Sequence, residues 1–255
     1  MIPSAVYLYE ELSLICLGWQ DFYMTVYVSL DDTDMPDSPG TGRLARDLFS
    51  LLEQRYQLLG ITRHQLYVHP DIPYTSHNSA AVIHIHTVLH EEQDALFDEI
   101  ARFVRSRAAR GSDPGICMAI HESVTPALIL FGKEAKSTIL TQDQAMTLAL
   151  HTKVRLAGLN GTKGGIIGAL AAVGLAASGS DGRYIQVGKI RTLRGKAVIS
   201  VIHDAGIPAV YSIDGKAIDS GEVRFRKFPQ PMRINHCPVL FVREDQGSLI
   251  VERRD

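Results

Sequence analysis

Three aspartates stand close together directly after a run of β-forming residues. Asp31, Asp32 and Asp34 lie within four positions, and residues 25–30 before them read TVYVSL. Carboxylates this close repel one another and lose hydration at the end of a buried strand, so a bound cation usually offsets their charge. Mg²⁺ suits them, because it commonly takes one or two carboxylates together with substrate phosphates. The segment therefore predicts a magnesium site built on these three aspartates.

A helix is expected to begin a few residues later, at Gly40, Thr41 and Gly42. The unpaired amides and the positive dipole end of a helix N-terminus form an anion site. Gly40 and Gly42 would then place a phosphate beside the aspartates. The alternative interpretation is an acidic surface turn in which Thr41 is a simple N-cap residue.

A glycine-rich segment between residues 158 and 168 offers a second phosphate site. It matches neither the Walker A pattern nor GxGxxG. Several glycines and a lysine just before a helix can nevertheless cradle a phosphate through backbone amides. The residues that such a site would use are Asn160, Gly161, Thr162, Lys163, Gly164, Gly165 and Gly168. Tight helix packing is the alternative explanation of the glycines.

Six of the ten histidines fall between residues 64 and 90. His84 and His86 share one face of an expected strand, so they could present two imidazoles to a metal or a phosphate. No third ligand is fixed by the spacing. Histidines that are simply half-buried or solvent-facing on a strand are the alternative.

The elements that position these residues follow a βαββαβ order, which is that of a ferredoxin-like unit. The hydrophobic patterns and turn residues indicate strands at 25–30, 66–69, 80–87 and 115–121, with helices at 43–59 and 91–110. A second α/β part follows, with a helix at 141–154 and an apolar helix at 166–177. Strand-like runs at 197–203, 223–228, 238–242 and 248–252 predict a β-rich C-terminal region. The expected fold class is therefore α+β.

Three segments are expected from this order. Residues 24–122 form the ferredoxin-like part with the aspartates, and residues 123–255 form the second part with the glycine-rich loop and the β-rich C-terminus. Residues 1–23 are expected to be an N-terminal extension outside the core. They hold no convincing signal peptide, since their apolar run is short and acidic residues precede it.

The composition is that of an ordinary soluble protein. The 255 residues are 45% hydrophobic and 21% charged, with a formal net charge of −2, which excludes disordered and collagen-like classes. The three cysteines are far apart and form no CxxC pair, so neither a disulfide framework nor a thiolate zinc site is indicated. A reducing cytoplasm and no membrane contact are expected.

The net charge hides an asymmetry between the two ends of the chain. Residues 183–255 carry 13 Lys and Arg against 8 Asp and Glu, whereas residues 1–182 carry 13 against 20. Two clusters of cations could form an anion-facing surface. They are Lys189, Arg191, Arg194 and Lys196, and Arg224, Arg226 and Lys227. Solvated faces of strands and turns are the alternative.

Several motifs together resemble the archaeal agmatidine synthetases, enzymes that modify the wobble cytidine of an isoleucine tRNA. They are VSLDDTD with the Pro/Gly/Thr turn after it, IPY at residues 72–74, the Asp113-Pro-Gly turn, and the glycine loop that runs into IIGALAAVG. They occur in order over about residues 24–180. The resemblance implies the catalytic core of such an enzyme, without the OB-fold and zinc-ribbon modules that grip tRNA.

The resemblance also implies ATP and Mg²⁺ as cofactors. In the family, the DDTD aspartates hold the metal and the ATP phosphates, and a threonine ten residues after the first aspartate becomes phosphorylated. These roles carry over to Asp31, Asp32, Asp34 and Thr41, and more loosely to Gly164, Gly165 and Gly168. The resemblance further implies that the enzyme activates the C2 carbonyl of the cytidine by phosphorylation, and that agmatine displaces the activating group.

One departure from the family bears on the substrate. After IPY the family continues Lys-Thr-Arg-Gly-Asn, but residues 75–79 here read TSHNS and lack both cations. Three functions therefore stay open: an ATP-dependent ligase or kinase-like enzyme that acts on tRNA or another RNA, an ATP-dependent enzyme that acts on a small amine or nucleoside, and a non-catalytic nucleotide-binding protein.

Overall fold

The computed structural model describes residues 24–75 and 77–252, which divide into two compact units, 24–178 and 179–252. The expected extension, residues 1–23, lies outside the described residues. The boundary expected after residue 122 falls inside the first unit, because the chain beyond it returns to cover the same sheet.

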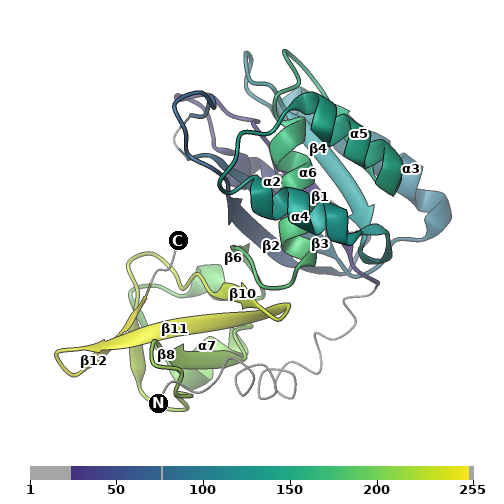
Figure 1. Cartoon of the computed structure of the whole chain (residues 1–255). Helices are drawn as coiled ribbons and strands as arrows, with labels where there is room; N and C mark the ends of the chain where they lie inside the picture. The colour runs from purple at the N-terminus through teal and green to yellow at the C-terminus, as the bar shows by residue number, and fades with distance from the viewer. Residues whose placement is uncertain (1–23, 76, 253–255) are drawn as a thin grey trace. The chain divides into compact units, whose positions relative to one another are not determined.

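The first unit is built on an antiparallel sheet of five strands (Figure 1). Across the sheet they are β5 (Arg155–Gly158), β4 (Gly115–Ile120), β1 (Val26–Asp31), β3 (Ser79–Ile85) and β2 (Leu58–Gln65). All four neighbouring pairs are antiparallel. With the two helices between these strands, the order is the expected ferredoxin-like βαββαβ, to which β5 adds an edge strand.

Helices cover both faces of this sheet. The helices α2 (Thr41–Leu52) and α3 (Gln93–Arg107) pack on one face, and α6 (Ile166–Ala177) packs on the other, over β1, β3 and β4. Outside α6 lie α4 (Pro126–Glu134) and α5 (Gln142–Thr152), as Figure 1 shows. Because residues alternate along β1, Ser29 and Asp31 face α6, and the hydroxyl of Ser29 donates to the carbonyl of Ala169 at 2.6 Å.

The helix α6 is apolar on all sides because it is buried on all sides. From Gly168 to Ala177 every residue of the helix is buried. Its small residues let neighbouring elements of the fold approach closely. A Cβ on Gly174, for example, would overlap the carbonyl of Leu128 in α4. The helix is therefore held in place by packing on all sides, and its N-terminus lies beside the end of β1.

Two expected elements of the first unit are wrong in their bounds. The helix expected to reach residue 59 ends at Leu52, and the strand expected at 66–69 lies instead at Leu58–Gln65. The leucine spacing continues a helical pattern past Leu52, but hydrogen bonding to β3 draws the following residues into the sheet. Neither α4 nor β5 was expected.

The second unit is rich in strands, as expected. Its strands are β6 (Arg183–Gln186), β10 (Met232–Ile234), β11 (Cys237–Asp245), β12 (Ser248–Val251), β9 (Glu222–Arg224) and β7 (Lys196–Val198), with β8 (Ala209–Ser212) parallel to β11. The strand expected at 197–203 is wrong, because β7 ends at Val198 and α7 (Ile199–Asp204) follows. Ile199 and Ile202 are both buried at helical spacing.

Two of the three cysteines lie in described strands, one in each unit. Cys117 in β4 is a free thiol, and burial raises its pKa. Cys237 is disulfide-bonded, which the spacing of the cysteines did not indicate. None of the helices within residues 24–75 and 77–252 has the length and hydropathy of a membrane-spanning segment.

Candidate functional site

A cavity of about 290 Å³ opens in the first unit, where β1 ends. Its floor is the end of β1 with the loop before α2, and its walls come from the β2–β3 loop, the α4–α5 connection and the N-terminus of α6. Five aspartates line it: Asp31, Asp32, Asp34, Asp71 and Asp113. Apolar side chains line it as well, namely Leu66, Ile72, Pro73, Ile139, Leu140 and Ile167. Among the described lining residues there is no Lys or Arg.

The carboxylate of Asp31 is held against the first turn of α6. A Cβ on Gly168 would overlap Oδ2 of Asp31 and lie 2.8 Å from Cδ1 of Leu66. Gly165 lies equally close to backbone, since its Cβ would be 2.6 Å from the carbonyl of Asp113 and 2.9 Å from that of Asp31. The absence of side chains at these two glycines thus lets Asp31 approach α6.

Two of the aspartates have raised pKa values. Burial, followed by the charge of Asp32, raises the pKa of Asp31 to about 7. Burial, followed by the charges of Asp113 and Asp34, raises the pKa of Asp32 to about 6. Asp32 also has a left-handed backbone, with φ of 50°, which Asp tolerates better than most residues. Both carboxylates are therefore placed where a bound cation would relieve mutual repulsion.

Asp34 is instead tied to hydroxyl groups. The hydroxyl of Thr41 donates to Oδ1 at 2.8 Å, and that of Thr75 donates to Oδ2 at 2.9 Å. Thr41, at the start of α2, also accepts a hydrogen bond from the hydroxyl of Thr33 at 3.0 Å. The proton of the Thr41 hydroxyl is thus directed at a carboxylate.

Asp113 anchors the glycine-rich loop. Its Oδ1 accepts from the amide of Thr162 at 2.9 Å, and its Oδ2 accepts from the Thr162 hydroxyl. From the other side, Nε2 of Gln142 in α5 donates to the carbonyl of Thr162 at 3.0 Å. The sequence pattern predicts a turn at Asp113 and does not indicate that its carboxylate belongs to the site.

The amides of this loop are largely used within the protein. Those of Lys163, Gly165, Ile166 and Ile167 donate to carbonyls of the loop and of Asp113, at 3.0–3.3 Å. A phosphate would have to compete with these bonds. The geometry favours close packing over a phosphate cradle as the reason for Gly165 and Gly168.

The predicted site residues divide into two groups. Those that line the cavity are Asp31, Asp32, Asp34, Thr41, Thr162, Gly164, Gly165 and Gly168. Those that lie outside its lining are Gly40, Gly42, Asn160, Gly161 and Lys163. Gly40 is the N-cap residue of α2, Gly161 has φ of 56°, and Lys163 packs against Gly158. The first group, drawn from segments more than a hundred residues apart, meets in one place.

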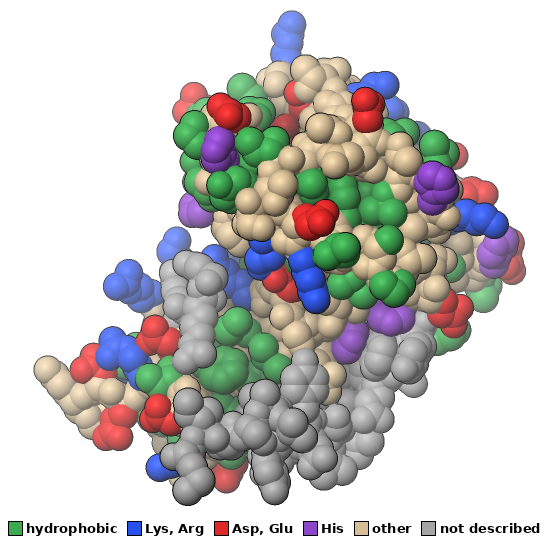
Figure 2. Space-filling model, in the orientation of Figure 1, with side chains coloured by type: hydrophobic (Ala, Val, Ile, Leu, Met, Phe, Trp, Pro, Cys, Tyr) green, Lys and Arg blue, Asp and Glu red, His purple; other side chains and the backbone are tan. Residues whose placement is uncertain are grey.

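The β2–β3 loop supplies residues that the patterns did not indicate. Asp71, Tyr74, Thr75 and His77 line the cavity from this loop. Figure 2 shows hydrophobic side chains, with acidic and His side chains among them, on the loops at this end of the sheet (upper left). The only signal was the IPY motif, which carries no charge.

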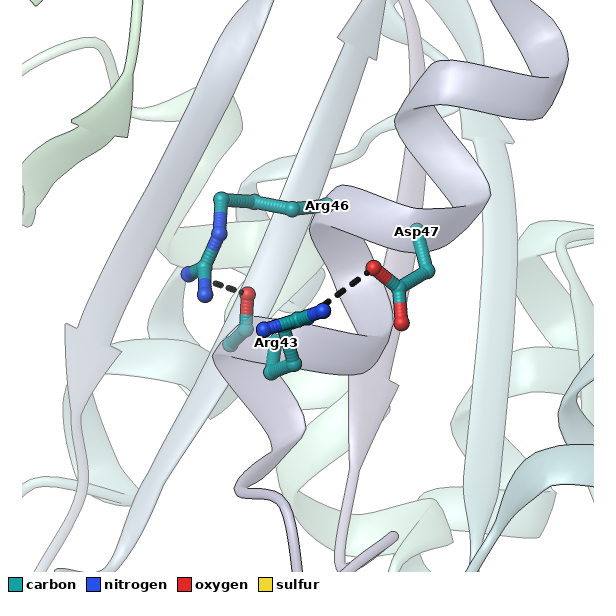
Figure 3. Close-up of polar contacts among 4 residues, drawn as sticks. Arg43, Arg46 and Asp47 are labelled. Carbon is teal, nitrogen blue, oxygen red and sulfur yellow. Dashed lines mark hydrogen bonds and ion pairs between the residues drawn. The ribbon is translucent and has the colours of Figure 1, made fainter. Parts of the chain in front are cut away.

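Two arginines near Thr41 lie along the surface of α2. Figure 3 shows Arg46 donating to the carbonyl of Gly42 at 2.7 Å and Arg43 paired with Asp47 at 3.1 Å. The Arg43–Asp47 pair is well exposed and contributes little to stability. Neither arginine lines the cavity, so they do not replace the cations that the β2–β3 loop lacks.

Two of the histidines belong to the core of the sheet. His64 and His84 are buried, and their Nε2 atoms each lie 2.7 Å from the hydroxyl of Thr62. The ring of His84 also packs edge-on against Tyr27. The metal site considered for His84 and His86 is not supported, since no group of three or more His, Cys, Asp or Glu within residues 24–75 and 77–252 is arranged to hold a metal.

The site expected at Asp31, Asp32 and Asp34 is likewise not supported as a set of three metal ligands, since the described residues contain no such group of three. Asp34 is engaged with two threonines, which leaves Asp31 and Asp32 as adjacent carboxylates. Two carboxylates completed by substrate phosphates and water fit Mg²⁺, and their raised pKa values fit a partner cation. We infer that these two residues fit the ion without a third protein carboxylate.

Mg²⁺ binding at this site is expected to depend on pH. Because the ion needs ionised carboxylates, its affinity should rise as the pH increases through about 6 to 7. Asp113→Asn removes a charge that raises the pKa of Asp32, so the rise should move to lower pH. Calorimetric titration with MgCl₂ at several pH values measures this.

The control for this experiment is Thr162→Val, which loses the hydroxyl donor to Asp113 and changes no charge. Its pH dependence should match that of the wild type. An unshifted curve for Asp113→Asn would contradict the electrostatic coupling.

Comparisons with known proteins place this fold and site in context. No protein-family model matches the chain. An uncharacterized protein of Methanocaldococcus jannaschii is 26% identical over 153 residues, which cover 59% of this chain and 50% of the relative. The chain thus spans about half the length of that relative.

Solved structures of the tRNAIle2 agmatidine synthetase TiaS are similar over the same share of the chain. The complex of TiaS with tRNA(Ile2) and ATP has a TM-score of 0.52 and 26% identity, covering 59% of this chain and 36% of that one. A tRNA fluorescent labeling enzyme has a TM-score of 0.51 and 27% identity, with the same coverage. The resemblance to the agmatidine synthetases is therefore confirmed, for about a third of their length.

Proposed function

We propose that the chain is an ATP- and Mg²⁺-dependent enzyme related to the tRNA-modifying agmatidine synthetases, in which the cavity beside Asp31 is the site of phosphoryl transfer. One observation carries the proposal: Asp31, Asp32 and Asp113 surround a cavity whose described lining holds no Lys or Arg. Such a site repels a bare phosphate and accepts one that arrives with a cation. The similarity to a TiaS complex that contains ATP supports the nucleotide.

Asp31 and Asp32 would hold Mg²⁺ through their carboxylates. When bound, the ion would neutralise negative charge on the ATP phosphates. The residues themselves mainly supply position: Gly168 fixes the depth of Asp31, and Asp113 fixes the loop that closes the cavity. Positioning and electrostatics are the main contributions of a protein to phosphoryl transfer.

Thr41 is proposed as the hydroxyl that accepts the phosphoryl group. Its Oγ1 would form a bond to the γ-phosphorus, the bond from that phosphorus to the bridging oxygen would break, and ADP would leave. The hydroxyl proton would pass to Asp34, to which it already donates at 2.8 Å. Thr75 keeps Asp34 in place through its second oxygen.

Incubation with Mg²⁺ and ATP is expected to leave a phosphate on Thr41, as detected by peptide mass spectrometry. Thr41→Val keeps the shape of the side chain but lacks the hydroxyl, so it should carry no phosphate. Thr41→Ser restores the hydroxyl and should be phosphorylated. Phosphate on the valine variant at another residue, or none on the wild type, would rule out Thr41 as the acceptor.

A second candidate substrate is a small cationic amine or a nucleoside. It is favoured by the five aspartates, the apolar walls and the missing cations of the β2–β3 loop. Incubation with Mg²⁺, ATP and a panel of amines and tRNAs, followed by mass spectrometry of the products, separates the candidates. ATP binding by calorimetry with no ADP, AMP or phosphoprotein formed would instead indicate a non-catalytic nucleotide-binding protein.

A further inference from the structure

Two clusters of cations that are far apart in the sequence lie side by side in the second unit. The strands β7 and β9 are antiparallel and place Lys196 directly opposite Arg224. The amide of Phe225 donates to the carbonyl of Gly195 at 2.8 Å, which continues the pairing by one residue. Strand pairing therefore joins the two clusters at the end strand of the sheet.

The cations at the end of β9 and just after it point away from the core. Val223 is 0% exposed and Phe225 is 7% exposed, and both belong to the hydrophobic core of this unit. Arg224 and Arg226 alternate with them and are exposed, as is Lys227. We use the name basic edge for the exposed residues Arg194, Lys196, Arg224, Arg226 and Lys227.

Few carboxylates neutralise the basic edge. Residues 182–203 and 223–243 contain no Asp or Glu. Glu222 pairs with Lys196 at 2.9 Å, but within residues 24–75 and 77–252 no carboxylate forms an ion pair with Arg224, Arg226 or Lys227. Like charges directly opposite each other on neighbouring strands destabilise a sheet. A polyanionic ligand would offset that cost.

We propose that the basic edge binds the phosphate backbone of RNA. The inference rests on the proposed function, taken with a tRNA as the substrate to be modified, and it locates a contact surface outside the residues that line the catalytic cavity. Three of the five cations are arginines, whose planar guanidinium groups match phosphate oxygens in pairs. The cations lie on the neighbouring strands β7 and β9, on the segment that precedes β7 and on the segment that follows β9, so they present several positive charges to a ligand with a repeating negative charge.

The test is the binding of a fluorescein-labelled tRNA(Ile2) transcript, measured by anisotropy between 50 and 200 mM KCl. The wild type should bind with a steep salt dependence. Arg224→Glu/Arg226→Glu/Lys227→Glu should raise Kd at least tenfold. A second variant with glutamine at the same positions should flatten the slope of log K against log salt by about two, at roughly 0.7–0.9 for each lost phosphate contact.

The matched control reverses three exposed arginines of the first unit, Arg102→Glu/Arg105→Glu/Arg110→Glu, for the same change in net charge. It should bind RNA far better than the basic-edge variant. Equal loss in the control, unchanged binding in both basic-edge variants, or no salt-dependent RNA binding by the wild type would overturn the proposal. Wild-type binding to phosphatidylserine vesicles in place of RNA would overturn it as well.

Failure of this inference is distinguishable from failure of the proposed function. RNA binding through the basic edge without ATP turnover would refute the catalytic proposal alone. ATP turnover without RNA binding would refute the basic edge alone and favour the small-molecule acceptor.

Discussion

Asp31→Asn is expected to abolish Mg²⁺-dependent ATP turnover and, at pH 8, to make the protein more stable. The variant keeps the size of the side chain and removes a charge that burial and Asp32 both disfavour. The rise in the pKa of Asp31 from 3.8 to about 7 corresponds to roughly 4 kcal/mol, at about 1.4 kcal/mol per pKa unit. Local relaxation around the charged group should reduce the gain in the free energy of unfolding to the order of 2 kcal/mol. Thermal unfolding would show it as an increase in Tm of roughly 4–8 °C.

The sign of this effect follows from the raised pKa. Between pH 4 and 7 the folded state binds a proton at Asp31 that the unfolded state has released, so Asp31 makes the wild type less stable as the pH rises through 7. The gain in the variant should therefore shrink as the pH falls from about 7 toward 4. Added Mg²⁺ should raise the Tm of the wild type and leave that of the variant unchanged.

Asp37→Asn is the matched control, because Asp37 is exposed in the same loop and does not line the cavity. It should change neither turnover nor Tm by a measurable amount. An Asp31→Asn protein that is less stable than the wild type at pH 8 would show that the carboxylate is already compensated within the chain.

Gly168→Ala is expected to damage both the fold and the site. Alanine normally favours a helix over glycine by about 1 kcal/mol. At Gly168, however, the added Cβ would overlap Asp31 and press on Leu66. We expect a net loss of roughly 1–3 kcal/mol, typical of an overpacked core, together with loss of ATP turnover as Asp31 is displaced.

The comparison for stability is Gly164→Ala, four residues earlier in the chain. Its Cβ would lie 3.5 Å from the hydroxyl of Thr162, an ordinary contact, and its φ suits any residue. The free energy of unfolding of this variant, measured by urea titration, should stay within about 0.5 kcal/mol of the wild type. Equal midpoints for the two alanine variants would mean that the approach of α6 to Asp31 is looser than described.

The fold was predictable where hydrophobic periodicity and pairing agree. The βαββαβ order follows from alternating strands and helical leucine spacing, and the sheet confirms it. The bounds failed where a local pattern competed with pairing. Leucines past Leu52 continue a helical pattern but lie in or near β2, and the run after Val198 is apolar enough for a strand but forms α7.

The candidate site was predictable only in part. Three aspartates within four residues predict a cation site, because their carboxylates repel one another. Asp113 and Asp71 are single acidic residues in turns, and nothing local distinguishes them from solvated side chains. They reach the cavity because β4 lies beside β1 and because the β2–β3 loop folds over the end of the sheet. The glycine-rich segment could be recognised in the sequence. The closeness of Gly165 and Gly168 to Asp31 could not be predicted, because it depends on how α6 packs on the sheet.

The most direct test of the central claim is the reaction of the full chain with γ-³²P-labelled ATP and Mg²⁺, comparing the wild type with Asp32→Asn. Asparagine tolerates the left-handed backbone at this position, so the variant should fold. We predict labelled phosphate on protein or acceptor with the wild type, and a loss of at least a hundredfold with the variant. Equal labelling by the two proteins would contradict phosphoryl transfer at the aspartate site.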